Sequence, residues 1–152
     1  MRLAPQETRT YHVTSVTAQR RSVFQVTANI ELFVQTLFDY RAQKKYLLHA
    51  FVLMPEHFHV LLTPAPEVSL EKAVQFIKGG CSFRLRHPHG LWMHSFNETQ
   101  IMDAERFFNC KLYIEANPVR RGLVSTPEDY RYSSATMKDL DAMPAHMQKA
   151  RG

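Results

Sequence analysis

The sequence of 152 residues lacks a hydrophobic run long enough to cross a bilayer. A membrane-spanning helix needs about 20 consecutive apolar residues, whereas the longest apolar stretch here, residues 46–55, is already interrupted by His49. The start of the chain has no apolar segment followed by a small-residue cleavage site, so it carries no recognisable export signal. We therefore expect a cytoplasmic protein without a membrane span.

Cysteine is also scarce. Cys81 and Cys110 are the two cysteines, and their spacing fits neither a disulfide framework nor a CxxC metal motif. Repeats and low-complexity segments are absent too, which excludes a solenoid and a long linker. Since a domain typically takes about 150 residues, the length leaves room for one domain. We assign residues 1–135 to that domain and residues 136–152, which are poor in apolar side chains, to a C-terminal tail.

The composition is that of an ordinary globular protein, with 45% hydrophobic and 22% charged residues. These values exclude a disordered chain. The 19 Lys and Arg outnumber the 14 Asp and Glu, giving a net charge of +5, which permits a polyanionic partner but also fits any basic soluble protein. Eight histidines are a stronger signal, because imidazole is the commonest metal ligand and acid/base group at neutral pH.

Hydrophobic periodicity predicts alternating strands and helices. Apolar residues alternate where strands are expected and recur every three or four residues where helices are expected. The predicted order is strand 11–17, helix 29–40, a strand hairpin 45–54 and 56–63 around Pro55, helix 69–86 beginning at Ser69, a short strand or extended segment 91–96, and helix 103–117 ended by Pro118. This order predicts an α+β fold, a ferredoxin-like antiparallel sheet with helices packed on it.

One predicted strand carries a pair of histidines. His57 and His59 are two residues apart, so their side chains lie on one face of the strand while Phe58 and Val60 lie on the other. Two imidazoles that converge in this way can act as a pair of metal ligands. The alternative is two histidines on a half-exposed strand that make ordinary hydrogen bonds.

A second pair of polar residues lies on the last predicted helix. Tyr113 and Asn117 are four residues apart and therefore share one helix face. Tyr113 alone could simply reach solvent with its hydroxyl. Asn117 alone could belong to the turn that an Asn-Pro pair commonly begins.

Two longer motifs contain these pairs, and together they resemble a known family. Met54-Pro-Glu-His-Phe-His-Val-Leu-Leu-Thr-Pro64 and Tyr113-Ile-Glu-Ala-Asn-Pro-Val-Arg-Arg-Gly-Leu-Val124 are similar to segments of the single-tyrosine HUH transposases, specifically the REP-associated tyrosine transposases. The resemblance extends over roughly residues 11–134. It implies an HUH endonuclease-type sandwich fold.

The resemblance also implies roles for residues. In that family the two histidines of the motif bind a divalent cation and a helix tyrosine attacks a phosphodiester of single-stranded DNA. Carried over, His57 and His59 become metal ligands, Asn117 a third ligand, and Tyr113 the nucleophile. The implied cofactor is Mg²⁺ or Mn²⁺, the implied product is a 5′-phosphotyrosine link, and the implied substrate is DNA with imperfect hairpins.

Basic residues are the candidates for DNA binding, although each one alone is more simply a solvated surface charge. We expect the second predicted helix to flank the site, which draws attention to its basic residues. The candidates are Arg20, Arg21, Lys78, Arg84, Arg86, Arg120 and Arg121.

The chain departs from the family pattern at two places. Glu115 and Ala116 separate the tyrosine from Asn117, and Arg121 stands where the resemblance leads us to expect a small residue before Gly122. Neither change removes a proposed catalytic group.

Two alternatives remain beside the transposase. A domesticated protein could bind DNA hairpins without cutting them, and an unrelated metal-dependent hydrolase or oxygenase could use two histidines on a small molecule. The sequence also leaves open a monomer or a homodimer that exchanges the tyrosine helix between subunits.

Overall fold

The structure is a computed structural model that describes residues 8–87, 90–137 and 139–148. Its centre is a four-stranded antiparallel sheet in the order β2-β3-β1-β4. The strands are β1 (Thr10–Val16), β2 (Tyr46–Met54), β3 (His57–Pro64) and β4 (Asn97–Ile101). This architecture confirms the predicted α+β fold.

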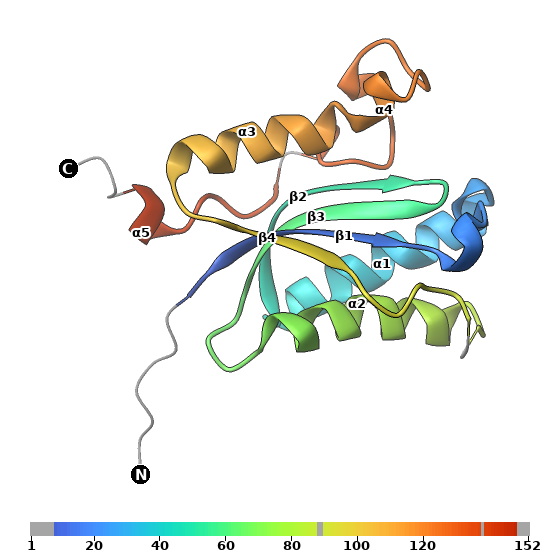
Figure 1. Cartoon of the computed structure of the whole chain (residues 1–152), viewed down its shortest axis with the longest axis horizontal. Coiled ribbons are helices and arrows are strands. Elements are labelled where there is room, and N and C mark those ends of the chain that lie inside the picture. Colours follow the sequence, from blue (N-terminus) through green and yellow to red (C-terminus); the bar gives the residue numbers. More distant parts are fainter. Residues whose placement is uncertain (1–7, 88–89, 138, 149–152) are drawn as a thin grey trace.

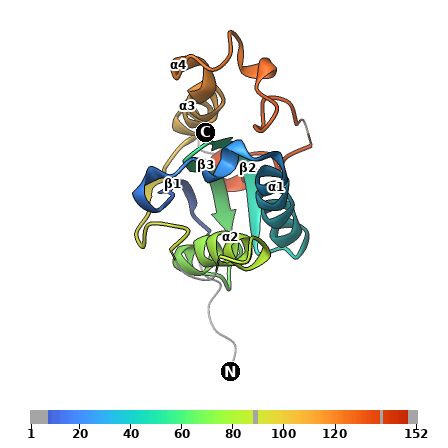
Figure 2. The same cartoon turned by 90° about the vertical axis from the view of Figure 1, so that its right-hand side faces the viewer.

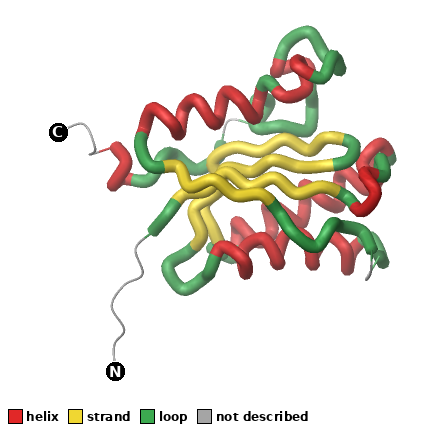
Figure 3. The backbone as a smooth tube through the Cα atoms, viewed as in Figure 1, coloured by secondary structure: helices red, strands yellow, loops and turns green. Residues whose placement is uncertain are grey.

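Helices cover both faces of the sheet (Figures 1 and 2). Helices α1 (Thr27–Ala42) and α2 (Leu70–Arg84) lie side by side on one face, and α3 (Ala104–Glu115) lies on the other. The short helices α4 (Asn117–Arg120) and α5 (Ala145–Gln148) follow α3 along the chain. Figure 3 shows the resulting three layers, helices, sheet and helix. Within the described part of the chain, no helix is both long and apolar enough to cross a membrane.

The helix starts follow from local sequence. The Ser69 hydroxyl accepts a hydrogen bond from the Lys72 amide at 3.1 Å and caps α2. The Asp103 carboxylate accepts one from the Arg106 amide at 2.8 Å and caps α3. Such caps satisfy amides that the first helical turn leaves without partners.

Gly80 does not break α2, although a glycine pair weakens a helix. A Cβ at this position would lie 2.8 Å from Cε2 of Tyr40 on α1. The missing side chain is therefore what allows α1 and α2 to approach closely over the sheet.

The structure differs from the sequence prediction at two element boundaries. The fourth strand is Asn97–Ile101, whereas residues 91–96 contain bends, and their one strand-like pairing within the described chain is an isolated bridge between Trp92 and Thr17. The last predicted helix ends at Glu115, and Pro118 lies in the first turn of α4. A proline is tolerated there because first-turn amides need no intrahelical partner.

The chain after α4 returns along the outer edge of β2. The Leu53 amide donates to the Tyr132 carbonyl at 3.0 Å, the Ser134 amide to the Phe51 carbonyl at 2.9 Å, and the Asp141 amide to the Leu48 carbonyl at 2.8 Å. These bonds cover backbone groups that an edge strand would otherwise expose. Met147 of α5 is buried against the α3 side of the sheet.

Candidate functional site

The alternation of side chains along β3 divides the strand between the two faces. Phe58, Val60 and Leu62 are fully buried in the core beneath α1 and α2. His57 and His59 lie on the α3 side, with their ring centroids 5.0 Å apart. The structure thus brings the two imidazoles together on one face, as the sequence spacing predicts.

His59 is held from behind by the neighbouring strand β1. Its Nδ1 lies 2.9 Å from the Thr14 hydroxyl and 2.9 Å from Nε2 of His12. Burial, together with smaller effects of the nearby His12, His57 and Arg120, lowers the pKa of His59 to about 3. The ring is therefore neutral at pH 7. With its proton on Nδ1, where both neighbours can accept it, the lone pair of Nε2 is free for a ligand.

His57 is oriented in the same way by a carboxylate. Its Nδ1 lies 2.9 Å from Oε1 of Glu56, and the Arg121 guanidinium donates to the same oxygen at 2.9 Å. Burial lowers the pKa of His57, against the opposing effect of Glu56. Burial alone would raise the pKa of Glu56, but the hydrogen bonds from Arg121 and His57 outweigh it and the net pKa is lowered. A carboxylate here leaves Nε2 of His57 as the ring nitrogen open to a ligand.

Asn117 brings an amide to the two histidines. It is buried, with 7% of its surface exposed, and its Nδ2 lies 3.1 Å from Nε2 of His59. Its Oδ1 is buried without a hydrogen-bond partner among the described residues. Such an unsatisfied polar atom is unusual in a folded protein and calls for an explanation.

The residues fit a divalent cation. Two imidazole nitrogens and an amide oxygen form a mixed nitrogen and oxygen set that can hold Mg²⁺ or Mn²⁺. A half-turn of the Asn117 amide would direct its orphaned Oδ1 at His59. Among the described residues, no group of three or more His, Cys, Asp or Glu side chains is arranged to hold a metal. The third ligand of this candidate set is an amide.

Tyr113 stands beside these groups, one helical turn before Asn117. It is 49% exposed, and its ring centroid lies 6.1 Å from that of His59 and 6.0 Å from that of His12. The guanidinium carbon of Arg120 lies 3.9 Å from the centroid of the phenol ring. This cation–π contact holds an exposed side chain next to the imidazoles.

Comparison with known families agrees with this geometry. The sequence model described as "Transposase IS200 like" matches residues 6–117, which is most of the chain. The chain belongs to the IS200-like transposase family. It therefore belongs to a class of DNA-processing enzymes that are in general metal-dependent. The family resemblance inferred from the two sequence motifs is confirmed.

Solved structures show the same fold. A REP-associated tyrosine transposase bound to a REP hairpin is similar with a TM-score of 0.74 and 20% identity, over 88% of this chain and 81% of that one. A candidate transposase from Deinococcus radiodurans has a TM-score of 0.53 and 24% identity, over 76% of this chain and 96% of that one. Among curated proteins no sequence matches.

Several basic residues of the transposase lie around the site. Arg120 lies over the ring of Tyr113, and Arg121 donates a hydrogen bond to Glu56. Arg20 is close enough for its charge to lower the pKa of His57, an effect smaller than that of burial. Arg21 donates to the Gly90 carbonyl. DNA binding by these four residues stays a prediction.

The basic residues of α2 lie elsewhere. Helix α2 packs on the sheet face opposite to the histidines, so the expectation that it flanks the site is wrong (Figure 2). Lys78 donates to the Met93 carbonyl at 2.8 Å, and Arg84 pairs with Asp39 at 2.6 Å. Arg86 follows the end of α2. Any DNA contact through Lys78, Arg84 and Arg86 stays a prediction and has to occur away from the histidines.

Sequence reasoning missed three residues of the site, His12, Thr14 and Glu56. His12 and Thr14 share one face of β1, and the register places Thr14 opposite His59. Because side chains alternate along a strand, His12 and Thr14 face the same side of the sheet as His59 once β1 is paired with β3. The sequence alone does not show that β1 is the neighbour of β3; the strand order of the structure does. Glu56 directly precedes His57, and its role depends on Arg121, which is distant in sequence.

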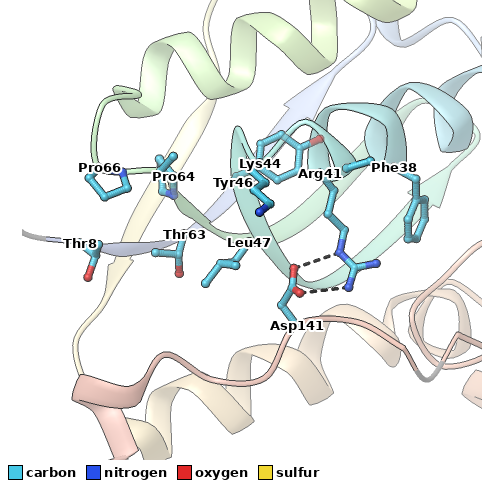
Figure 4. Close-up of a pocket in the computed structure, with 12 residues that line it drawn as sticks. Thr8, Phe38, Arg41, Lys44, Tyr46, Leu47, Thr63, Pro64, Pro66 and Asp141 are labelled. Carbon is cyan, nitrogen blue, oxygen red and sulfur yellow. Dashed lines mark hydrogen bonds and ion pairs between the residues drawn. The ribbon is translucent and has the colours of Figure 1, made fainter.

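A separate pocket of about 730 Å³ lies near the C-terminal end of α1. Its lining includes Phe38, Leu47 and Pro64, and the ion pair between Arg41 and Asp141 borders it (Figure 4). The proposed catalytic residues do not line this pocket. Enzymes that act on small molecules usually bind them in a largely apolar pocket such as this one. The histidine site is distinct from this pocket.

Proposed function

We propose that this transposase is a metal-dependent endonuclease and strand-transferase for single-stranded DNA. In this proposal Tyr113 is the nucleophile, and His57, His59 and Asn117 hold Mg²⁺ or Mn²⁺. The observation that carries the proposal is the orphaned Oδ1 of Asn117 beside two neutral imidazoles, one helical turn from an exposed tyrosine.

The proposed substrate is a DNA hairpin. A solved relative with the same fold is bound to a REP hairpin, and we extend that substrate class to this chain. The net charge of +5 favours a polyanionic partner. The exposure of Tyr113 lets an extended strand reach the phenol.

The proposed cleavage transfers a phosphodiester of the DNA to Tyr113. The Oη of Tyr113 attacks the phosphorus, a new P–O bond forms, and the bond from phosphorus to the 3′-oxygen breaks. The phenol loses a proton and the departing 3′-oxygen gains one, leaving a 5′-phosphotyrosine and a free 3′-hydroxyl. Because the phosphodiester is replaced by another of similar energy, the reverse attack by a 3′-hydroxyl rejoins strands without ATP.

The other residues prepare this step. Arg120 holds the phenol ring and places a positive charge beside it. Glu56 and Thr14 orient the two imidazoles so that their Nε2 atoms are free. When bound, the cation supplies Lewis-acid stabilisation of the charge that develops on the scissile phosphate. Tyr113 and the proposed ligands belong to one chain, so a monomer contains the complete set.

A labelling experiment tests the proposal. Purified protein is incubated with end-labelled hairpin oligonucleotides that carry single-stranded flanks, in Mn²⁺, and separated by denaturing electrophoresis. We expect label at the size of the protein for the wild type and for Tyr132→Phe, a matched loss of a hydroxyl outside the site. Tyr113→Phe should form no adduct.

Other outcomes would contradict the proposal. An adduct in Tyr113→Phe would exclude Tyr113 as the nucleophile. Hairpin binding without any adduct would favour the non-cleaving, domesticated alternative.

A further inference from the structure

Arg121 forms an ion pair that the family resemblance does not lead us to expect. A small residue is expected at this position, yet the Arg121 guanidinium donates to Oε1 of Glu56 at 2.9 Å. The Glu56 side chain is only 11% exposed, whereas that of Arg121 is 49% exposed. The pair therefore joins a half-exposed cation to a nearly buried carboxylate.

The same carboxylate oxygen faces His57. Nδ1 of His57 lies 2.9 Å from Oε1 of Glu56. An imidazole that donates from Nδ1 to a carboxylate keeps its proton there and presents the Nε2 lone pair to a cation. A buried carboxylate is costly without a compensating charge. Arg121 supplies that charge by donating to the same Oε1 that faces His57.

The ion pair also connects two parts of the fold. Glu56 belongs to the turn between β2 and β3, and Arg121 directly follows α4. Asn117 is the first residue of α4, and its carbonyl accepts a hydrogen bond from the Arg121 amide at 3.0 Å. Holding Arg121 on Glu56 therefore also fixes Asn117 relative to His57.

We propose that Arg121 is a positioning residue that, through its ion pair with Glu56, fixes the ring of His57 and the placement of Asn117. This inference rests on the proposed function, because it assigns His57 and Asn117 to one cation. Arg121 does not touch the cation or the DNA phosphate in this role.

The first test uses the metal-free protein. Nitrogen-15 NMR of the histidine rings, assigned with His57→Gln, should show the proton of His57 on Nδ1 in the wild type. Arg121→Ala and Glu56→Ala should each convert this signal to a mixture of the two tautomers. Arg121→Lys should restore it in part, because a lysine retains the charge. The matched control is Arg106→Ala, which removes an exposed arginine paired with Asp103 at the other end of α3.

The second test measures Mn²⁺ affinity of the same variants by calorimetry, without DNA. Glu56→Ala should weaken binding about 10- to 100-fold, the usual loss for a carboxylate behind a metal-binding histidine. Arg121→Ala should weaken it about fivefold, the upper range for a partly exposed ion pair. Because Arg121 acts through Glu56, Arg121→Ala should add no loss in the Glu56→Ala background.

The outcomes separate the two proposals. If the wild type binds no Mn²⁺ but the tautomer of His57 still changes in Arg121→Ala, the proposed metal site is wrong. The proposal that the ion pair positions His57 is then retained. A wild type that binds Mn²⁺, with Arg121→Ala unchanged in tautomer and affinity, overturns the role of Arg121. The role of Arg121 is also overturned if Arg121→Ala binds hairpin DNA more weakly than the wild type in EDTA while its His57 spectrum is unchanged. That result would indicate a direct contact between Arg121 and a DNA phosphate.

Discussion

The two faces of the sheet are built by different rules. On the α1 and α2 side, β3 contributes Phe58, Val60 and Leu62, all fully buried, and the Phe58 ring lies 5.1 Å from that of Phe33. On the α3 side the same strand contributes His57 and His59, which are held by hydrogen bonds. One strand thus buries apolar side chains on one face and places the two histidines that we propose as metal ligands on the other.

The second face is only partly apolar. Helix α3 packs Phe107 and Ile114 on Val52 and Leu61, and the histidines lie beside its C-terminal end, near Tyr113. Polar side chains buried there cost stability unless they are satisfied. Each face contains one buried polar atom without a hydrogen-bond partner among the described residues: Oγ of Ser15, opposite Phe58 on the first face, and Oδ1 of Asn117 on the second. The faces differ in what surrounds these atoms, since Oδ1 of Asn117 belongs to an amide beside the imidazole of His59, in the group of side chains that we propose to hold a cation.

Removing an aromatic side chain from the first face should have the largest effect on stability. Phe58→Ala should lower the free energy of unfolding by about 3–5 kcal/mol, because it leaves a cavity in a filled core. Urea denaturation followed by circular dichroism measures the change. A loss no greater than that of His59→Ala would break the proposed division between the faces.

Removing a ligand from the second face should abolish stabilisation by metal. At a Mn²⁺ concentration 100 times its dissociation constant, the wild type should gain about 2.7 kcal/mol of unfolding free energy. His59→Ala should lose this gain, whereas His146→Ala, an exposed histidine on α5, should keep it. Denaturation with and without Mn²⁺ tests this, and an undiminished gain in His59→Ala would exclude that ligand.

Replacing the unsatisfied amide should separate metal binding from stability. Asn117→Leu keeps a similar volume and removes a buried polar atom without a partner. Its unfolding free energy without metal should be unchanged or higher by up to about 1 kcal/mol. The Mn²⁺-dependent gain should fall in the same titration. A large loss of stability without metal would show instead that Asn117 is a structural residue.

Weakening the segment on the β2 edge should have the smallest effect. The Asp141 carboxylate accepts hydrogen bonds from Arg41 at 3.0 Å and from the Leu48 amide at 2.8 Å. Burial alone would raise the pKa of Asp141, but these bonds outweigh it and lower the net pKa. Asp141→Asn should cost at most about 1 kcal/mol at pH 7, because the ion pair is partly exposed.

This cost should depend on pH. A lowered pKa stabilises the folded state above the unfolded value of about 3.9, and the contribution is lost as the pH falls through the folded pKa. Denaturation at pH 7 and near pH 2 should therefore show the difference between Asp141→Asn and the wild type disappearing in acid. Glu128→Gln, an exposed carboxylate, provides the matched control. A difference that persists in acid would exclude the ion pair as its source.

Much of this division is predictable from local sequence. The alternation around His57 and His59 determines which residues share a face, and the four-residue spacing brings Tyr113, near the end of α3, close to Asn117, the first residue of α4. Ser69 marks the start of α2 because its hydroxyl has an amide to accept from. These features depend on neighbours within a few residues.

Other features depend on contacts between distant segments. β4 is short and mostly exposed, with little apolar alternation to indicate a strand, and it is held by pairing with β1. His12 reaches His59 only because β1 lies beside β3. The side of the sheet that α2 covers and the pairing of Arg121 with Glu56 likewise follow from tertiary structure.

The most direct test of the central claim is to locate the DNA adduct. Protein incubated with hairpin oligonucleotides and Mn²⁺ would be digested with nuclease and trypsin and analysed by mass spectrometry. Cleavage after Lys111 and Arg120 gives a peptide of residues 112–120 whose single tyrosine is Tyr113. The account predicts a nucleotide mass on this tyrosine. A nucleotide on any other residue, or hairpin cleavage without an adduct, would contradict it.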